Sequence, residues 1–529
     1  MTIRMEDAVV KHPRRNLSRP SPHAIAVASC AALSLSVTVA THAQTTDEAG
    51  ALAGPNPSVW VEPRVSAGVT LSNNGALSAT NPQSEQTFEV SPGVRVVVNR
   101  PRVKGFLDYS LTGLYSAQGT SRDNLRHALN ANARIDAWDN RAFIDVSGVV
   151  SDQSVSALGT SSRLADANRS ETASYRLSPF VRGNLAGLAD YEARYSLLSS
   201  STGASDRSDV TSQDVSLSLA SPRDGQTLGW LFNAALQETD YSQGRRTQSD
   251  TLRAGLVYAA TPQLAFTVFA GVESNDVITP SRKSYSYNGL NLDWRPSPRT
   301  RVNAGVDDRY FGHSHNVLVE HRTGRTVWRF TDNQGVSNSL LNAANATLGS
   351  LYNLMDSLYT SVEPDPIKRA QLIEADLLKL GLPGSTPVSR PFLTSSATVQ
   401  RAQQLSVALV GVRDVITLAV SRGNTRRLDT AFSLGDDFDT EAAIRQQSWS
   451  LIYAHRLTPI TAFSASLSGE KSTGTTTGSE TRSQSLELGV TTRLGLRTSG
   501  SVQLRRTVTS GTSSNYGETA IAGLITHRF

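Results

Sequence analysis

Apolar and polar residues alternate along most of this chain with a period of two. The alternation begins near Trp60, where Val61, Val65 and Val69 are separated by polar side chains. A period of two is typical of β-strands that have one apolar and one polar face. The clearest runs lie at 88–98, 107–115, 175–181, 191–197, 230–236 and 264–272. The pattern therefore predicts an all-β protein.

The connections between these runs distinguish two all-β architectures. Alternation alone fits a soluble β-sandwich as well as a membrane barrel. Short turns at 99–102, 221–224, 261–262, 296–298 and 457–459 alternate with longer polar loops at 73–84, 155–170, 199–206, 242–248, 275–283, 424–440 and 471–479. Outer-membrane barrels have short periplasmic turns and longer external loops. We therefore predict an antiparallel transmembrane β-barrel of about 18–22 strands.

The C-terminal stretch predicts the strand that closes this barrel. A β-protein can span a bilayer only if its last strand pairs with its first, because every backbone group needs a partner there. The residues on one face of this stretch are Thr519, Ile521, Gly523, Ile525, His527 and Phe529. The terminal Phe529 resembles the signal by which the barrel-assembly machinery recognises outer-membrane proteins, although His527 stands where an aromatic is more usual. We assign Phe529 as an assembly signal.

The N-terminus has the pattern of a cleaved signal peptide. Arg14, Arg15 and Arg19 precede an apolar run over 24–40, and Thr41-His42-Ala43 provides a small-residue cleavage site. A lipoprotein signal at Val27-Ala28-Ser29-Cys30 is the alternative. We predict a leader over 1–43, a periplasmic segment over 44–58 and an outer-membrane barrel over 59–529.

The composition of the predicted mature chain limits its functions. Its 486 residues (529 − 43) contain no cysteine and carry a net charge near +2, because the leader holds +3 of the total +5. So small a charge gives no reason to expect a nucleic-acid partner. No apolar run approaches the roughly 18 residues of a membrane helix. The lipid of the outer membrane is therefore expected to meet strands.

The polar faces of several strands predict a wet lumen of mixed charge. The lumen candidates are Arg126, Asn130, Asn132, Arg134, Asp136, Asp190, Glu192, Arg194, Arg301, Asn303, Asp307 and Arg309. The planar fork of arginine suits hydroxyl-rich or anionic ligands. The alternative is that these charges only pair with one another.

One segment, 338–396, departs from the strand pattern. Leucines spaced as on a helix run from 341 to 358, and a second helix is predicted from an N-cap at Asp365 and Pro366 to Gly381 and Pro383. Two helices in one connection are expected either to fold over the mouth or to enter the barrel as a plug. The insertion would then gate the pore, dock a partner, or form a rigid lid.

The sequence contains no recognisable catalytic, cofactor or metal motif. Glu470-Lys471-Ser472 lacks the glycine of a phosphate loop, and a chain without cysteine has no thiol chemistry. His313 and His315 near Asp307 are a weak metal candidate. The acidic residues Asp436, Asp437, Asp439 and Glu441 indicate a solvated external loop, and the tryptophans 138, 230, 294, 328 and 449 indicate interfacial or packing positions. We predict a non-enzyme without cofactors.

Several segments together resemble the PEP-CTERM-system-associated outer-membrane proteins of Gram-negative bacteria. They are 123–136, 151–159, 309–312, 321–330, 364–383 and 389–393, in this order. The sequence departs from the resemblance at His313-Ser314-His315, where a shorter Asn turn is expected. The resemblance implies a barrel whose gene accompanies exopolysaccharide-biosynthesis and protein-sorting clusters, and it supplies no catalytic residues.

Two functional hypotheses follow from the sequence. The first is a non-catalytic, porin-like barrel that helps to export exopolysaccharide through its polar lumen, with the polymer and its export apparatus as partners. The second is an outer-membrane anchor that binds polysaccharide or a protein partner through the helical insertion and the external loops. A third, an outer-membrane hydrolase, would need a clustered nucleophile that the sequence does not show.

Overall fold

The computed structural model describes residues 58–119, 124–159, 168–204, 207–222, 225–242, 244–337, 351–360, 362–365, 368–370, 372–373, 376–377, 392–394, 396–428, 436–512 and 515–529. The predicted leader (1–43), the segment 44–57 and the first predicted helical turns (338–350) lie outside these residues.

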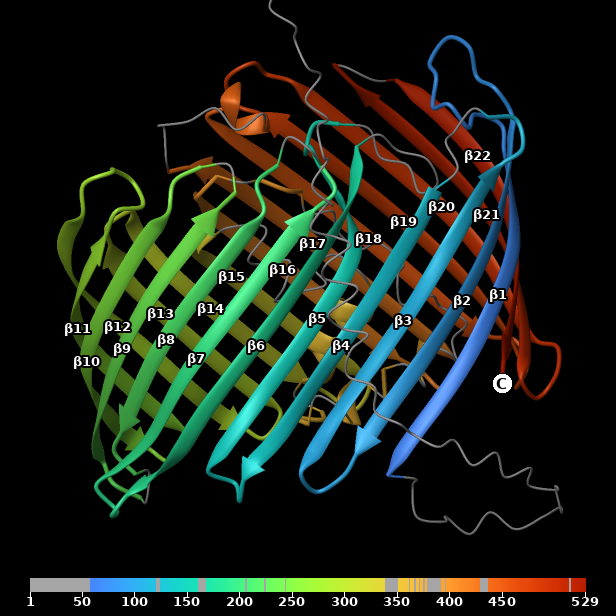
Figure 1. Ribbon diagram of the computed structural model, residues 1–529. Coiled ribbons are helices and arrows are strands. Elements are labelled where there is room, and N and C mark those ends of the chain that lie inside the picture. The colour runs from blue at the N-terminus through green and yellow to red at the C-terminus, as the bar shows by residue number, and fades with distance from the viewer. Residues whose placement is uncertain are drawn as a thin grey trace, which may run out of the picture. The chain divides into compact units, whose positions relative to one another are not determined.

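Twenty-two antiparallel strands, each paired with its neighbours in the chain, form one closed barrel (Figure 1). The strands are β1 (Val59–Ser72), β2 (Glu85–Asn99), β3 (Val103–Ser116), β4 (Asn124–Trp138), β5 (Ala142–Ser154), β6 (Arg169–Leu185), β7 (Ala189–Thr202), β8 (Val210–Ala220), β9 (Leu228–Tyr241), β10 (Thr247–Thr261), β11 (Leu264–Asn275), β12 (Lys283–Ser297), β13 (Thr300–Arg309), β14 (Gly312–Arg322), β15 (Thr326–Ser337), β16 (Thr398–Val410), β17 (Asp414–Arg427), β18 (Ala443–Arg456), β19 (Thr461–Gly474), β20 (Glu480–Arg493), β21 (Thr498–Gly511) and β22 (Tyr516–Arg528). The barrel prediction is confirmed, at the upper end of the predicted range of strand numbers.

The first and last strands join the sheet into a ring. In the register of β1 and β22, Val65 lies opposite His527 and Ser72 lies opposite Ala520. The amide of Phe529 adds a hydrogen bond of 3.0 Å to the Pro63 carbonyl. Closure leaves no sheet edge with unpaired backbone groups, which is what a bilayer requires of a β-protein.

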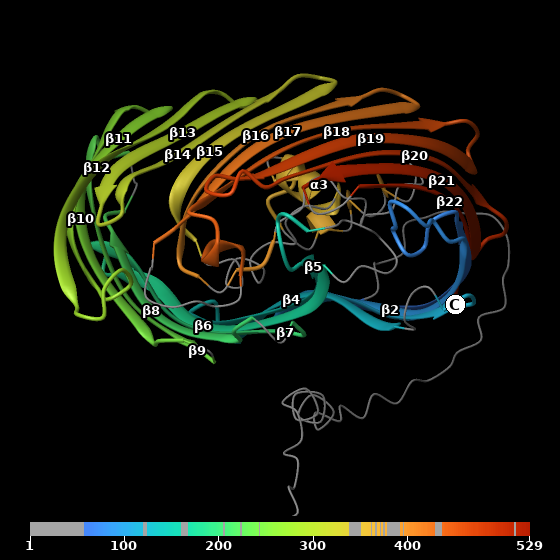
Figure 2. The ribbon, with the colours of Figure 1, turned by 90° about the horizontal axis from the view of Figure 1, so that it is seen from above.

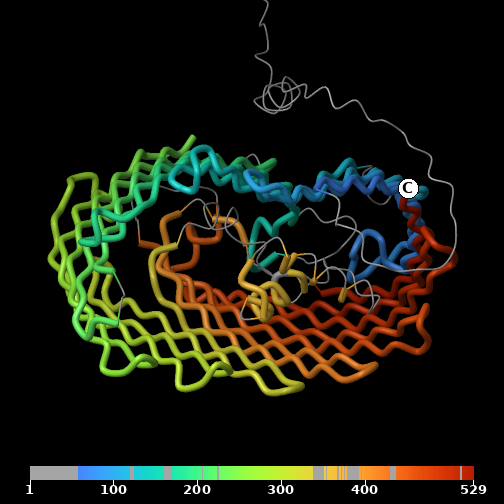
Figure 3. Tube along the Cα trace, turned by 90° about the horizontal axis from the view of Figure 1, so that it is seen from below, coloured from blue at the N-terminus to red at the C-terminus, as the bar shows by residue number. Residues whose placement is uncertain are grey.

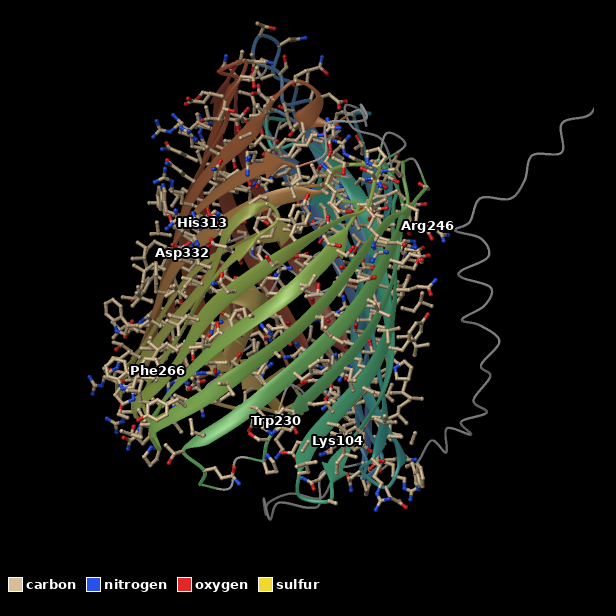
Figure 4. The ribbon with its side chains drawn as sticks, turned by 90° about the vertical axis from the view of Figure 1, so that its left-hand side faces the viewer. Lys104, Trp230, Arg246, Phe266, His313 and Asp332 are labelled. Atoms are coloured by element: carbon tan, nitrogen blue, oxygen red, sulfur yellow. The ribbon has the colours of Figure 1, made fainter. Side chains whose placement is uncertain are left out.

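The apolar face of the strands points outward, away from the lumen. Leu125 on β4, Leu256 on β10 and Val306 on β13 are 57%, 67% and 56% exposed. Trp294 and Trp328 are exposed on the same outer face close to the short-turn end, and Trp230 also lies near that end (Figure 4). Such a surface, apolar with tryptophans at one border, is that of a barrel embedded in lipid. This is therefore a transmembrane β-barrel.

The strands extend further into the predicted loops than the sequence indicated. Ser199, Asn424 and Lys471 were predicted to lie in loops, but they belong to β7, β17 and β19. These residues lie beyond the apolar band, so the outer face there is polar and the alternation that marks a strand disappears. At the same end, β13 and β14 are joined by only two residues before Gly312, whose φ of +111° suits glycine.

The insertion between β15 and β16 enters the barrel. Helix α3 (Leu351–Tyr359) lies inside the ring of strands when the barrel is seen along its axis (Figures 2 and 3). The described residues of the second predicted helix, 368–370, 372–373 and 376–377, are helical, and Asp365 caps them by accepting a 3.4 Å hydrogen bond from the Lys368 amide. No helix among the described residues is long and apolar enough to cross a membrane. The structure thus favours the plug over the lid.

Candidate functional site in the barrel lumen

The inward face of each strand is identified by the outward apolar residues next to it. On β4 the exposed Leu125 is outward, so Asn130, Asn132 and Arg134 face the lumen. By the same alternation Glu192 and Arg194 on β7, and Asn303, Asp307 and Arg309 on β13, face inward. The remaining candidates lie towards the strand ends: Arg126 near the loops, and Asp136, Asp190 and Arg301 near the short turns.

A first cluster of charges lies where β4 to β7 face the lumen. Asp145 on β5, which the sequence did not single out, binds both Arg134 (Nε–Oδ1, 2.6 Å) and Arg194 (Nη1–Oδ2, 3.1 Å). Arg194 also binds Glu192 at 3.0 Å. The guanidinium of Arg194 lies 3.8 Å from the ring centroid of Phe180, which stabilises the cation further. Carboxylates, guanidinium groups and an aromatic ring thus contact one another along this wall of the lumen.

A second cluster repeats this arrangement on β10 to β13. Arg309 binds Glu273 (Nε–Oε2, 2.7 Å) and lies 3.5 Å from Asp307. Its guanidinium stacks on Tyr287, at 4.9 Å from the ring centroid. Arg253 stacks on Phe269 at the same distance. Neither Glu273 nor the aromatic residues were predicted, because each lies in an ordinary alternating run, and only the strand register places them beside Arg309.

These clusters face water although they lie within the barrel. The side chains of Arg194 and Arg309 are each 24% exposed. A dry interior would have covered them, as it covers the great majority of charged groups in protein cores. The described lumen therefore has wetted walls on which a polar molecule could exchange hydrogen bonds with arginines and carboxylates.

Helix α3 packs its apolar face against the inner wall of β16 to β18. One buried cluster contains Leu351, Leu354, Met355, Leu358, Ile373, Leu377, Ala408, Ala419, Ile452 and Ala454. The alanines contributed by the strands leave room for the leucines of the helix. Both helical segments therefore dock on an apolar, small-residue patch in a lumen whose other walls are polar.

Polar contacts hold the two helical segments together and to the wall. Tyr359 donates a 2.7 Å hydrogen bond to Asp376, and Arg369 pairs with Asp356 at 2.7 Å. Arg329 on β15 donates to the Ser357 carbonyl at 3.3 Å and pairs with Glu320. Burial, followed by the hydrogen bond to Asp376, raises the pKa of the Tyr359 phenol. The helices are thus tied to each other and to the wall.

Tyr352, which packs beside the apolar cluster, brings α3 near a different part of the barrel. Tyr352 is within electrostatic range of Arg95 on β2 and Asp108 on β3, while burial raises its pKa to about 12. On the wall, Asp108 accepts hydrogen bonds of 3.1 and 2.6 Å from Arg64. The helix therefore extends from the β16–β18 wall towards β2 and β3, and it obstructs this part of the lumen.

The loops also cross the mouth of the barrel. Asp436, next to the short helix η1 (Asp437–Asp439), accepts hydrogen bonds from Thr394 (2.5 Å) and Ser396 (3.3 Å) of the returning insertion. Phe392 lies against Phe438, with ring centroids 6.0 Å apart. The returning end of the insertion and the loop between β17 and β18 are thus in direct contact.

The prediction that the acidic residues of this loop are solvated is therefore wrong for most of them. Asp436 and Glu441 are buried. Glu441 accepts hydrogen bonds from the Thr477 hydroxyl and the Thr476 amide, the latter at 2.7 Å. Burial raises the pKa of the Asp437 carboxyl, which accepts a 2.7 Å hydrogen bond from the Ala157 amide. Asp436, Asp437 and Glu441 therefore connect neighbouring loops through hydrogen bonds, and Asp439 alone of the four is exposed.

The metal candidate is also contradicted. His313 and His315 point outward on β14 while Asp307 points into the lumen, because odd positions of β13 and β14 face opposite sides in their register. His313 pairs with Asp308, and His315 pairs with Asp332 at 2.9 Å. No group of three potential ligands suited to a metal ion occurs among the described residues.

Comparison with known proteins gives likenesses in structure alone. No family model and no curated protein matches the chain. The FrpB iron transporter from Neisseria meningitidis (F3-3 variant) aligns with 89% of this chain and 81% of its own, at 10% identity and a TM-score of 0.49. The siderophore receptor PirA from Pseudomonas aeruginosa aligns with 88% and 80%, at 8% identity and a TM-score of 0.41. OccK2 (OpdF) from Pseudomonas aeruginosa, in complex with glucuronate, aligns with 89% of this chain and 98% of its own, at 9% identity and a TM-score of 0.33. Likenesses this distant transfer no ligand and no transport activity to this chain.

Proposed function

We propose that this protein is a non-catalytic outer-membrane barrel that passes a hydrophilic cargo, with its own helical insertion as the gate. The observation that carries the proposal is the contrast within the lumen. The walls at β4–β7 and β10–β13 are wetted and charged, whereas the wall at β16–β18 is apolar and holds α3. A lumen that served only as a filled core would not need two wetted walls.

The proposed cargo is an exopolysaccharide, and this part rests on the resemblance to exopolysaccharide-associated barrels. The lumen chemistry supports it. Arginine forks such as those of Arg194 and Arg309 suit hydroxyls and carboxylates of sugars. Because these arginines are already paired with Asp145, Glu192 and Glu273, each contact with the polymer would be weak. Weak, repeated contacts suit a chain that must slide.

The second candidate function is an anchor that docks polysaccharide or a partner through the insertion. It is less favoured, since the described helical residues of the insertion lie inside the barrel and Leu351, Leu354 and Ile373 are buried there. A docking element would present such a face outward. The anchor is nevertheless the outcome expected if the barrel never conducts.

Conductance of the reconstituted barrel tests the proposal. The full-length protein in a planar bilayer is expected to be closed or to open briefly, and a variant in which 338–396 is replaced by a short linker is expected to conduct steadily. A folded deletion variant that stays closed would overturn the gated passage. In cells, the deletion variant should restore polymer secretion to a knockout strain. Intact secretion in the knockout, with loss of polymer attachment to the surface, would favour the anchor.

A further inference from the structure

Seven cations point outward on one side of the barrel, at the loop ends of β16 to β21. They share the outward face with the apolar residues Leu405, Val420, Trp449, Leu467, Leu486 and Val508. These cations, here called the basic outer surface, are Arg401, Arg422, Arg426, Arg445, Lys471, Arg482 and Arg506. They face neither the lumen nor the loops that cover the mouth.

Strand register gathers four of these arginines around one residue. Asn424 on β17 lies directly opposite Arg401 on β16 and Arg445 on β18. Arg422 and Arg426 lie two positions away on its own strand, on the same face. Residues directly opposite each other, or two positions apart on one face, are separated by about 5–7 Å between Cα atoms. Each of the four arginines is therefore about 5–7 Å from Asn424, and about 10–14 Å separates the arginines across it, so only their long side chains can reach one polyanionic group together.

This surface carries more positive charge than its own carboxylates can neutralise. The outward carboxylates at the same end of β15 to β22 are Asp332 and Glu480, so seven cations less two anions leave +5. Asp332 binds Arg401 at 2.7 Å and Glu480 binds Lys471 at 2.8 Å.

The side chains of four arginines of the basic outer surface make no hydrogen bond or ion pair with any part of the chain that the structure describes. They are Arg422, Arg426, Arg445 and Arg482. The wall at β9 to β12 differs, since Arg246 pairs with Asp240 at 2.6 Å and Arg282 pairs with Asp250. Arg246 lies towards the loop end in the view of that wall (Figure 4). The unpaired arginines therefore distinguish the wall at β16 to β21 from the wall at β9 to β12.

The height of Arg422, Arg426 and Arg445 on the wall matches the border of the membrane. Strands rise about 3.4 Å per residue, so Arg422 lies about 7 Å beyond Val420, towards the loops. An outward arginine is costly at the centre of a bilayer and nearly free of cost at its border. The guanidinium groups thus reach the level at which the phosphates of lipids lie, on the side that carries the long external loops.

We propose that the basic outer surface binds the phosphate groups of an anionic lipid in the external leaflet, with Arg422, Arg426 and Arg445 as its principal ligands. Guanidinium forks bind phosphate oxygens through paired, charge-assisted hydrogen bonds. A lipid headgroup that carries two phosphates suits the surface, because four arginines surround Asn424 and Arg482 lies two strands further along. The bound lipid would hold the barrel at a fixed height beside β16 to β18, the strands on which the gate docks.

Binding of purified protein to a phosphorylated lipid tests the proposal. The full-length barrel in neutral detergent is titrated with bis-phosphorylated lipid A, with the same lipid after removal of its phosphates, and with inorganic pyrophosphate. The test variant is Arg422→Gln/Arg426→Gln/Arg445→Gln, and the matched control is Arg246→Gln/Arg282→Gln, beside β10 and β12. Native mass spectrometry counts bound lipid, and heat-dependent gel mobility verifies that each variant is folded.

We expect the triple variant to bind bis-phosphorylated lipid A about 100-fold more weakly, since each cation at a membrane surface contributes roughly fivefold. The control variant should bind like the unchanged protein, and added salt should weaken binding. Equal binding by the triple variant, or equal binding of the dephosphorylated lipid, would show that these arginines are merely solvated. Competition by pyrophosphate at the same concentration as the lipid would mean a free-anion site and would also overturn the lipid proposal.

Discussion

Leu354 and Leu358 lie one turn apart on α3, and both belong to the apolar cluster that joins the helix to the β16–β18 wall. Only 4% and 3% of their surfaces are exposed. Truncation of one buried leucine to alanine removes transfer free energy and leaves a cavity, at a cost of about 2–5 kcal/mol. The two sites are neighbours and their costs are not strictly additive. We take about 4 kcal/mol for the double variant Leu354→Ala/Leu358→Ala.

This loss acts on docking of the gate more than on the barrel, because the strands keep all their backbone pairing. A shift of about 4 kcal/mol changes an equilibrium roughly 1,000-fold. An insertion that is undocked one time in 10,000, for example, would become undocked about one time in ten. The open probability of the reconstituted barrel should rise accordingly, with the single-channel conductance of each opening unchanged.

The matched control is Leu372→Ala on the second helical segment. Leu372 is 41% exposed, so its truncation removes little buried surface and should leave gating unchanged. Single-channel recording in planar bilayers measures both variants. If the double variant stays as closed as the unchanged protein while its barrel is folded, the apolar cluster does not hold the gate. If the control opens as much as the double variant, burial is not the cause.

Three further predictions concern charges. Burial and the hydrogen bond to Asp376 raise the pKa of Tyr359 above the value of about 10 for free tyrosine. The contribution of the protonated phenol to docking is therefore present below pH 10 and is lost as the pH rises through the raised pKa. The open probability of the channel should increase above pH 10, and it should increase less in Tyr359→Phe. In the barrel that lacks the insertion, Asp145→Asn removes a negative charge that neutralises two lumen arginines. The reversal potential in a salt gradient should therefore shift towards anion selectivity. An unchanged reversal potential would place Asp145 away from the ion path. Glu518→Ala leaves the largely buried Arg505 without its carboxylate near the closing strands, and should destabilise the barrel by about 2 kcal/mol, measured as a lower midpoint of heat-dependent gel mobility.

The sequence by itself determined the architecture of the wall. An apolar face repeats at a period of two from Val61 to Ile525, short and long connections alternate, and the final strand has the pattern needed for closure. Each of these signals is local, since it depends on residues within about ten positions of one another. The same locality marked the helical insertion and its cap at Asp365. These features could be predicted because the bilayer demands the same pattern of every strand.

Only the tertiary structure decided which charges meet and where the insertion lies. Asp145 joins Arg134 and Arg194 because three neighbouring strands set its partners, and nothing near Asp145 in the sequence indicates this. Asn424 was predicted in a loop, yet the register of β16, β17 and β18 places it among four arginines. The direction of the insertion depends on an apolar patch, formed by Ala408, Ala419 and Ile452, that exists only once the strands have paired. Strand register and burial between distant residues are properties of the closed ring. The periodicity of apolar residues along one strand predicts neither of them.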